Sequence, residues 1–212
     1  MRNISALATK IAFITTIIFP LSSFSQDIND DVFQLPLEEL MKQQVSSVSK
    51  KLQDLEDIPA AAYVITAKDI QRSGATSIPE ALRLAPGVNV AAIANNKWAV
   101  SIRGFNSRAS DKVLVLVDGR TLYPPIYPGT LWENNDIPLD LIERIEILRG
   151  TGAAIWGNNA VNGVINIITK SAHDVIGGQL SVIAGSEEQT IANGIYGWAL
   201  DERTSFRVHA YS

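Results

Sequence analysis

The stretch Leu141-Ile142-Glu143-Arg144-Ile145-Glu146-Ile147-Leu148-Arg149-Gly150 decides the fold of the middle of this chain. A segment rich in Gly, Ala and Asn, residues 151–162, follows it, and a second β-branched run covers residues 163–170. β-Branched residues favour strands and glycine-rich segments favour turns, so the pattern predicts two neighbouring strands. Glu146 lies between two isoleucines, and a charge inside a strand is costly unless it is solvated or paired. We therefore expect one face of this sheet to meet water or a charged partner surface.

The first 25 residues have the pattern of a secretory signal. Arg2 and Lys10 provide a positive start, residues 11–21 form an apolar core, and Ser23-Phe24-Ser25 is a small-x-small cleavage site. The core is shorter than the roughly 20 residues that a membrane-spanning helix needs. A buried N-terminal helix is the alternative, but position, charge and cleavage pattern all favour export.

Composition excludes several classes of function. The net charge is −4, and it becomes −6 if residues 1–25 are removed with their two positive charges. Nucleic-acid binding is therefore not expected, because it requires a basic surface. The chain has no cysteine, and its two histidines, His173 and His209, are far apart in sequence. We expect no disulfide, no metal site and no cofactor.

Four segments follow one another along the chain. After the signal at residues 1–25, residues 26–57 are predicted to be an N-terminal arm, with an extended segment where hydroxyl and β-branched residues resist helix formation. A plain linker is the alternative for this arm. Residues 58–172 are predicted to form a small α+β domain with a mixed sheet and short helices. Residues 173–212 alternate between polar and apolar positions.

Local signals predict the elements of the α+β domain. Thr66 is expected to cap a helix that follows a strand at 61–66, and Gly74 to end it. Ser77 and Glu80 have the spacing of a capping box for a second helix, which Pro86-Gly87 ends. The remaining predictions are strands at 88–93, 98–103 and 113–117, the last covered on both faces, a turn at Asp118-Gly119, a loop at 123–129 and a helical turn at 138–143.

The tail predicts the start of an antiparallel transmembrane β-barrel. Residues 179–184, 195–200 and 205–211 alternate in polarity and are separated by turn signals. Trp198, Phe206 and Tyr211 are candidates for an aromatic girdle at the membrane interface. Three strands cannot close a barrel, since the smallest membrane barrels need about eight. The sequence is therefore expected to be a truncated barrel or a fragment of a longer protein.

No catalytic or nucleotide-binding set is convincing. Gly152 and Gly157 have the spacing of a phosphate-binding loop, but Asn158 and Asn159 stand where Lys and Ser or Thr are required. A Gly-x-Ser-x-Gly nucleophile elbow is missing as well. The glycines are better interpreted as turn residues, and we do not expect an enzyme. Arg103 and Arg149 each end a strand before a glycine. They are either exposed strand-end residues or arginines aimed at carboxylates on a surrounding surface.

Taken in order, these motifs resemble the N-terminal part of TonB-dependent outer-membrane receptors, over about residues 35–212. The motifs that carry the resemblance are Ile58-Pro59-Ala60, Ala67-Lys68-Asp69-Ile70, Arg72-Ser73-Gly74, Ile78-Pro79-Glu80-Ala81-Leu82, Pro86-Gly87-Val88, Ile102-Arg103-Gly104-Phe105, Val117-Asp118-Gly119-Arg120, residues 142–150, and Trp156-Gly157 to Asn166-Ile167-Ile168.

The resemblance implies a plug domain that fills a barrel of about 22 strands. Such receptors lie in the outer membrane of Gram-negative bacteria, in contact with its lipid. They import scarce ligands, typically ferric siderophores or vitamin B12, with energy passed on by TonB. It further implies that Arg103 and Arg149 pair with barrel glutamates. A TonB box is also implied, and the extended, β-prone candidate is Val45, Ser46, Ser47, Val48 and Ser49.

The ligand is expected on three apical loops, at residues 94–97, 106–111 and 123–129. Packing or solvation is the alternative for their polar residues. A free-standing periplasmic binding module is the alternative function, although unpaired barrel strands would have no use in it. A signal transducer would need an extra N-terminal domain, for which the stretch from Gln26 to Ile58 is short. The candidate ligand residues are Asn95, Asn96, Lys97, Asn106, Arg108, Tyr123 and Tyr127.

Overall fold

A computed structural model describes residues 44–45, 53–54, 61–108, 110–127, 129–150, 156–157, 159–185, 191–201 and 203–211. All of these belong to one structural unit, residues 37–212. The predicted signal sequence and most of the arm lie outside the described residues. Within the arm, two short strands pair antiparallel, β1 (Gln44–Val45) and β2 (Gln53–Asp54).

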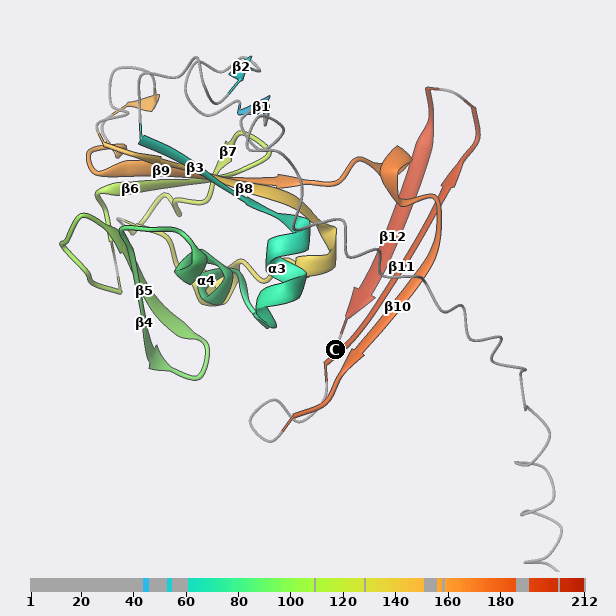
Figure 1. Cartoon of the computed structure of the whole chain (residues 1–212), viewed down its shortest axis with the longest axis horizontal. Helices are drawn as coiled ribbons and strands as arrows, with labels where there is room; N and C mark the ends of the chain where they lie inside the picture. Colours follow the sequence, from blue (N-terminus) through green and yellow to red (C-terminus); the bar gives the residue numbers. More distant parts are fainter. Residues whose placement is uncertain are drawn as a thin grey trace, which may run out of the picture. The chain divides into compact units, whose positions relative to one another are not determined.

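A five-stranded mixed sheet forms the centre of the fold (Figure 1). Its strand order is β3-β8-β9-β6-β7, and β6 and β9 are its one parallel pair among the described strands. The two strands predicted around the glycine-rich turn, β8 and β9, pair antiparallel at its centre, which confirms that prediction. The strand bounds are β3 (Ala61–Thr66), β6 (Val113–Val117), β7 (Arg120–Thr121), β8 (Ile142–Arg149) and β9 (Gly163–Thr169).

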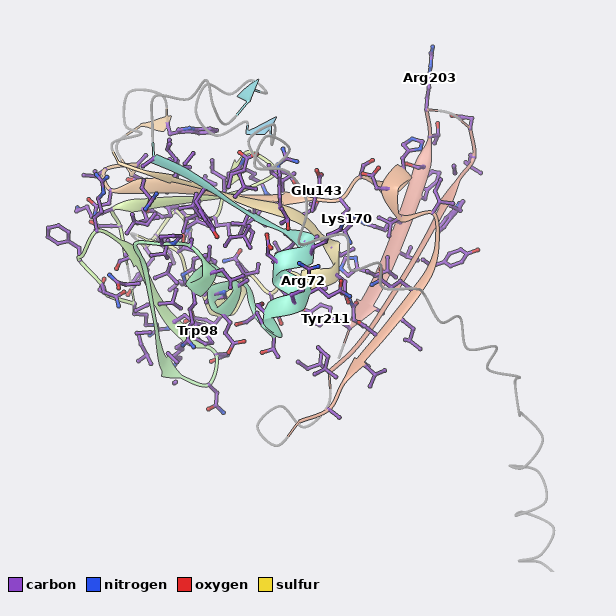
Figure 2. The ribbon with its side chains drawn as sticks, in the orientation of Figure 1. Arg72, Trp98, Glu143, Lys170, Arg203 and Tyr211 are labelled. Atoms are coloured by element: carbon purple, nitrogen blue, oxygen red, sulfur yellow. The ribbon has the colours of Figure 1, made fainter. Side chains whose placement is uncertain are left out.

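The main hydrophobic core lies on one face of this sheet, under the short helices and the hairpin of β4 and β5 (Figure 1). Every residue of β6 is buried, as the continuous apolar run predicts. Trp98 of the hairpin also packs against the core, and the Arg83 guanidinium lies 5.6 Å from the centre of its ring (Figure 2). The covering elements are α3 (Ala67–Ser73), α4 (Ile78–Ala81), η3 (Leu82–Leu84), β4 (Val88–Ala94) and β5 (Lys97–Ile102).

Capping follows the prediction at the first helix and departs from it at the second. Thr66 and Asp69 form a reciprocal capping box, and Gly74 ends α3 at φ 68°. Ser77 makes no such bond to Glu80, so that predicted capping box is wrong. The carboxylate of Glu80 instead accepts from the backbone N–H and the hydroxyl of Thr76, at 2.8 and 3.0 Å. Thr76, one residue earlier, therefore takes the acceptor that the capping box would use.

The opposite face of the sheet does not meet water at Glu146, contrary to expectation. Glu146 is fully buried, and its Oε1 accepts from Nε of Arg144 at 2.9 Å. Arg144 also pairs with Glu143, at 2.6 Å, near the surface. The buried charge is compensated by a cation two residues away on the same strand face, because side chains at i and i+2 point to the same side.

Short 3₁₀ segments connect the sheet to the rest of the chain. The predicted helical turn at 138–143 is confined to η5 (Leu139–Leu141), because β8 already begins at Ile142. Asp118 and Gly119 form the predicted turn, and Asp118 accepts from the backbone N–H and hydroxyl of Thr169, both at 2.9 Å. The other segments are η4 (Trp132–Asn134) and η6 (Ala172–Val175).

The tail forms a three-stranded antiparallel sheet, as its alternation predicts. The strands are β10 (Gly177–Ile183), β11 (Ile191–Ala199) and β12 (Ser205–Tyr211). In the strand register one face, here called the outer face, carries only apolar and small residues. Its large members are exposed: Leu180, Val182, Tyr196, Trp198, Phe206 and Val208.

The other face of this sheet, here called the inner face, is mixed and bonds back to the α+β domain. Asp140 of η5 accepts through Oδ2 from Ser181 Oγ at 2.6 Å and from Asn193 Nδ2 at 2.7 Å. Tyr211 also belongs to this face, and its hydroxyl donates to the carbonyl of Asp136 at 3.4 Å (Figure 2). Trp198 and Phe206 stack on the outer face with ring centres 5.6 Å apart. Tyr211 was therefore wrongly assigned to the girdle, because it shares the register of Asn193.

Candidate functional site

Glu133 contacts the second of the three loops that the sequence singles out. It lies in η4 and forms an ion pair with Arg108, from the second loop. The hydrogen bond from Arg108 lowers the pKa of the Glu133 carboxyl, and the charge of Lys97, beside the first loop, acts in the same direction. The same hydrogen bond raises the pKa of Arg108, and Tyr127 of the third loop adds to that shift. Sequence reasoning missed Glu133, because a glutamate in an irregular segment carries no periodic signal.

The first loop is shorter than predicted. Ala94 and Lys97 end and begin strands, so only Asn95 and Asn96 form the turn between β4 and β5, and both are exposed. Asn106 is exposed in the second loop. These three amides present hydrogen-bond donors and acceptors to solvent, in keeping with a polar binding surface.

Tyr123 differs from the other candidates, because its phenol is used inside the protein. Its hydroxyl lies 3.1 Å from the carbonyl oxygen of Val113, to which it donates, and 3.4 Å from that of Ser110. Burial, with a smaller contribution from Asp111, raises the pKa of Tyr123 to about 12. Tyr127, in contrast, remains exposed. Within the third loop the exposed ring is therefore that of Tyr127.

Two exposed apolar side chains accompany these loops and were not predicted. Ile126 is 94% exposed and Phe105 is 76% exposed. Arg103, Gly104 and Phe105 all have positive φ, at 57°, 97° and 57°. A left-handed backbone is strained for residues other than glycine, and such strain tends to gather at functional sites. The only sequence signal for this turn is Gly104.

The Arg103 guanidinium lies beside Gly150, and the Arg149 guanidinium lies beside Pro86 and Gly87. A Cβ placed on Gly150 would lie 3.7 Å from NH1 of Arg103. Arg149 donates to two backbone carbonyls, from Nε to Ala61 at 3.4 Å and from NH1 to Pro86 at 3.1 Å. Neither arginine forms an ion pair with a carboxylate in the described part of the chain. Each guanidinium group therefore suits an anionic partner.

The candidate TonB box is described only at its first residue. Val45 belongs to β1 and pairs with Gln53 of β2. Ser46, Ser47, Val48 and Ser49 lie outside the described residues.

The described ranges hold neither a metal-binding cluster nor a membrane-crossing helix. No group of three or more His, Cys, Asp or Glu side chains in this part of the chain is placed to hold a metal ion. Among the same residues no helix is both long and apolar enough to cross a membrane.

Residues 54–164 match the family model described as the TonB-dependent Receptor Plug Domain. The chain is 32% identical over 191 residues to the vitamin B12 transporter BtuB of Vibrio vulnificus, an alignment that covers 89% of this chain and 28% of that protein. Over 141 residues it is 38% identical to BtuB of Vibrio cholerae, covering 64% of this chain and 22% of that protein. The chain thus spans between about a fifth and just over a quarter of the length of these relatives.

Solved structures also match this chain. The siderophore receptor PirA from Pseudomonas aeruginosa matches with a TM-score of 0.53 at 32% identity, over 73% of this chain and 28% of that one. The structure of the FpvAI-pyocin S2 complex matches with a TM-score of 0.67 at 20% identity, over 79% and 21% of the two chains. At that identity the likeness shows the fold alone.

Proposed function

Because this chain belongs to the family of TonB-dependent receptors with a plug domain, we propose that it takes part in energy-coupled uptake of a scarce ligand across the outer membrane. It acts as a receptor and transporter rather than as an enzyme. The observation that carries this proposal is the order of the two sheets: a plug-type mixed sheet leads directly into antiparallel strands with an apolar outer face. Such a face suits lipid, and the polar inner face suits the lumen of a barrel.

The ligand is a ferric siderophore or a cobalamin. Both classes are named among the relatives, a vitamin B12 transporter at 32% identity and a siderophore receptor at 32% identity. The three loops provide the surface for it, with the amides of Asn95, Asn96 and Asn106 and the ring of Tyr127 exposed. Aromatic rings and a few oriented polar groups are typical of small-molecule sites.

Arg103 and Arg149 face acidic side chains on the barrel wall. Neither guanidinium forms an ion pair among the described residues, and arginine forms bidentate pairs with carboxylates that persist under partial burial. These ion pairs would hold the plug in position inside the barrel.

TonB binds by adding a strand to the arm at residues 45–49. Strand addition needs an extended segment, and Val45 already lies in one. Ligand binding shifts the equilibrium of the arm toward the periplasm, where TonB can reach it. The arm leads into β3, which pairs only with β8 among the described strands and is an edge strand there. A pull on the arm therefore acts first on the strand with a single neighbour, and part of the plug yields.

Deleting residues 45–49 tests this assignment. We expect uptake of labelled cobalamin or ferric siderophore by cells to be abolished, while binding of the same ligand to isolated outer membranes is unchanged, because the deletion lies apart from the loops. Deleting five residues at 37–41 is the matched control for arm length, and it should leave uptake intact. Unchanged transport after deletion of 45–49 would refute the assignment.

A further inference from the structure

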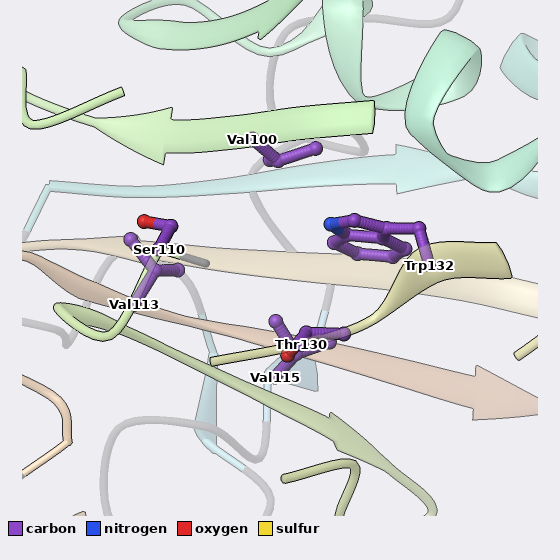
Figure 3. Close-up of a pocket in the computed structure, with 6 residues that line it drawn as sticks. All are labelled: Val100, Ser110, Val113, Val115, Thr130 and Trp132. Carbon is purple, nitrogen blue, oxygen red and sulfur yellow. The ribbon is translucent and has the colours of Figure 1, made fainter. Parts of the chain in front are cut away.

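A small cavity lies between the second and third loops and the central sheet. Its volume is about 10 Å³. Valines from β5 and β6 form its apolar wall, whereas Ser110 comes from the second loop and Thr130 and Trp132 from the segment that follows the third loop. The lining residues are Val100, Ser110, Val113, Val115, Thr130 and Trp132 (Figure 3).

Two hydroxyl groups in this cavity have no hydrogen-bond partner among the residues that the structure describes. Ser110 is 9% exposed and Thr130 is 4% exposed, and the side-chain oxygen of each is buried and unpaired. An unsatisfied buried hydroxyl costs about 1–3 kcal/mol, and the large majority of such groups in proteins are paired. Two of them lining one cavity therefore indicate that something polar bonds to both.

Trp132 adds a third polar group. Its ring lines the same cavity, and Figure 3 shows the indole nitrogen turned toward the side on which Ser110 lies. The cavity therefore offers one donor from Trp132 and two hydroxyls, each of which can donate or accept.

We propose that this cavity binds one ordered water molecule. The water accepts from the indole N–H of Trp132 and forms hydrogen bonds with Ser110 Oγ and Thr130 Oγ1. Its volume matches the roughly 10–15 Å³ that a single water needs, and three polar partners match the usual number for a buried water. The valine wall leaves no polar group for a second water, so the site takes one.

Such a water fastens two loops to each other. Ser110 ends the segment that carries Arg108, and Thr130 precedes the segment that carries Glu133. The ion pair joins these segments near the surface, and the water joins them again underneath. This second link orders the loops independently of any ligand, so it does not rest on the proposed function.

The thermal stability of the full chain folded in detergent tests the proposal. Removing a hydroxyl that bonds to a water should lower Tm, whereas removing a hydroxyl without a partner should leave Tm unchanged or raise it. Thr130→Val keeps the shape of the side chain and removes its hydroxyl. If a water bridges the site, this variant and Ser110→Ala each lower Tm by about 2–4 °C, because each removes about one hydrogen bond. An unchanged or raised Tm in Thr130→Val would overturn the proposal.

Ser101→Ala is the matched control. The Ser101 hydroxyl is also fully buried and unpaired, but it does not line the cavity. Its removal should leave Tm unchanged or raise it. The double variant Ser110→Ala/Thr130→Val should lose less than the sum of the single losses, because both lose the same water. A high-resolution crystal structure gives a second, direct readout: density for one water in the cavity supports the proposal, and its absence overturns it.

Discussion

At Gly163, the first residue of β9, the backbone of β8 comes too close for a side chain. A Cβ there would lie 2.4 Å from the carbonyl oxygen of Leu148 and 2.8 Å from Cδ1 of Ile102. The pairing of β8 with β9 therefore depends on glycine at this position, because backbone atoms cannot turn aside as a flexible side chain can.

We expect Gly163→Ala to lower the free energy of unfolding by about 1–3 kcal/mol, the range for overpacked sites. Gly178→Ala is the control, because a Cβ there would meet the ring of Tyr196 at an ordinary 3.5 Å. Denaturant unfolding of both variants measures the difference, and equal losses would contradict the close approach.

Tyr123 makes stability depend on alkaline pH. Its pKa is about 12 in the folded protein against about 10 in an unfolded chain, so folding favours the protonated phenol. This contribution is complete below about pH 10 and is lost as the pH rises toward 12. In Tyr123→Phe we expect a loss of about 1 kcal/mol at neutral pH, from the bond to Val113, and a weaker fall in stability above pH 10. Unfolding midpoints measured across this pH range test it, and parallel curves for the two proteins would contradict it.

Glu146 shows where residue-level prediction from sequence fails. Its position inside an apolar run predicts that its charge must be compensated, and the structure bears this out. The sequence did not reveal that Arg144 on the same strand face compensates the charge while the residue is fully buried. A glutamate paired with a neighbouring arginine and a glutamate exposed to water give the same sequence pattern. The structure is therefore needed to decide between these two explanations for Glu146.

Among the elements, the sequence predicts the strand positions accurately, whereas one of the two predicted helix caps is wrong. Strand positions follow from β-branched runs bounded by turn residues, which is why 61–66 and 113–117 match the observed bounds. The capping box at Ser77 failed because Glu80 had a competing donor at Thr76, one residue outside the motif. Whether a short capping motif forms its hydrogen bonds depends on small differences in position between neighbouring donors.

The three-stranded sheet provides a matched test of its two faces. Leu180 lies on the outer face and its neighbour Gln179 on the inner face. If the outer face meets lipid, we expect Leu180→Arg to cost about 2–4 kcal/mol of stability in lipid vesicles near the bilayer centre, whereas Gln179→Arg should cost far less. Urea unfolding of both variants from vesicles measures this, and equal costs would show that the outer face does not contact lipid.

On the scale of the whole molecule, Asp140 joins the central sheet to the tail. Its Oδ2 accepts from Ser181 and Asn193, and its backbone carbonyl accepts from Lys170 Nζ at 2.8 Å. Hydrogen bonds to a charged group contribute about 1.5–3 kcal/mol. Asp140 thus fastens β10 and β11 of the tail to the α+β domain.

In Asp140→Ala we expect faster amide hydrogen exchange in β10 and β11 and unchanged exchange in β8 and β9, because only the docking of the tail is weakened. Asp136→Ala is the control, since only the backbone carbonyl of Asp136 accepts a hydrogen bond within the described residues. Equal exchange in the tail of the two variants would show that Asp140 does not hold it.

The sequence by itself determined the strands and the order of the two sheets, because strand periodicity and turn residues are local properties of the chain, and its motifs carried the resemblance to the family. The tertiary structure alone decided the partners of its polar groups: Glu133 with Arg108, Glu146 with Arg144, Asp140 with Ser181 and Asn193. Most of these pairs join residues distant in sequence. Periodicity carries no record of such pairs, since they depend on how folded segments meet and on which competing donor lies nearest.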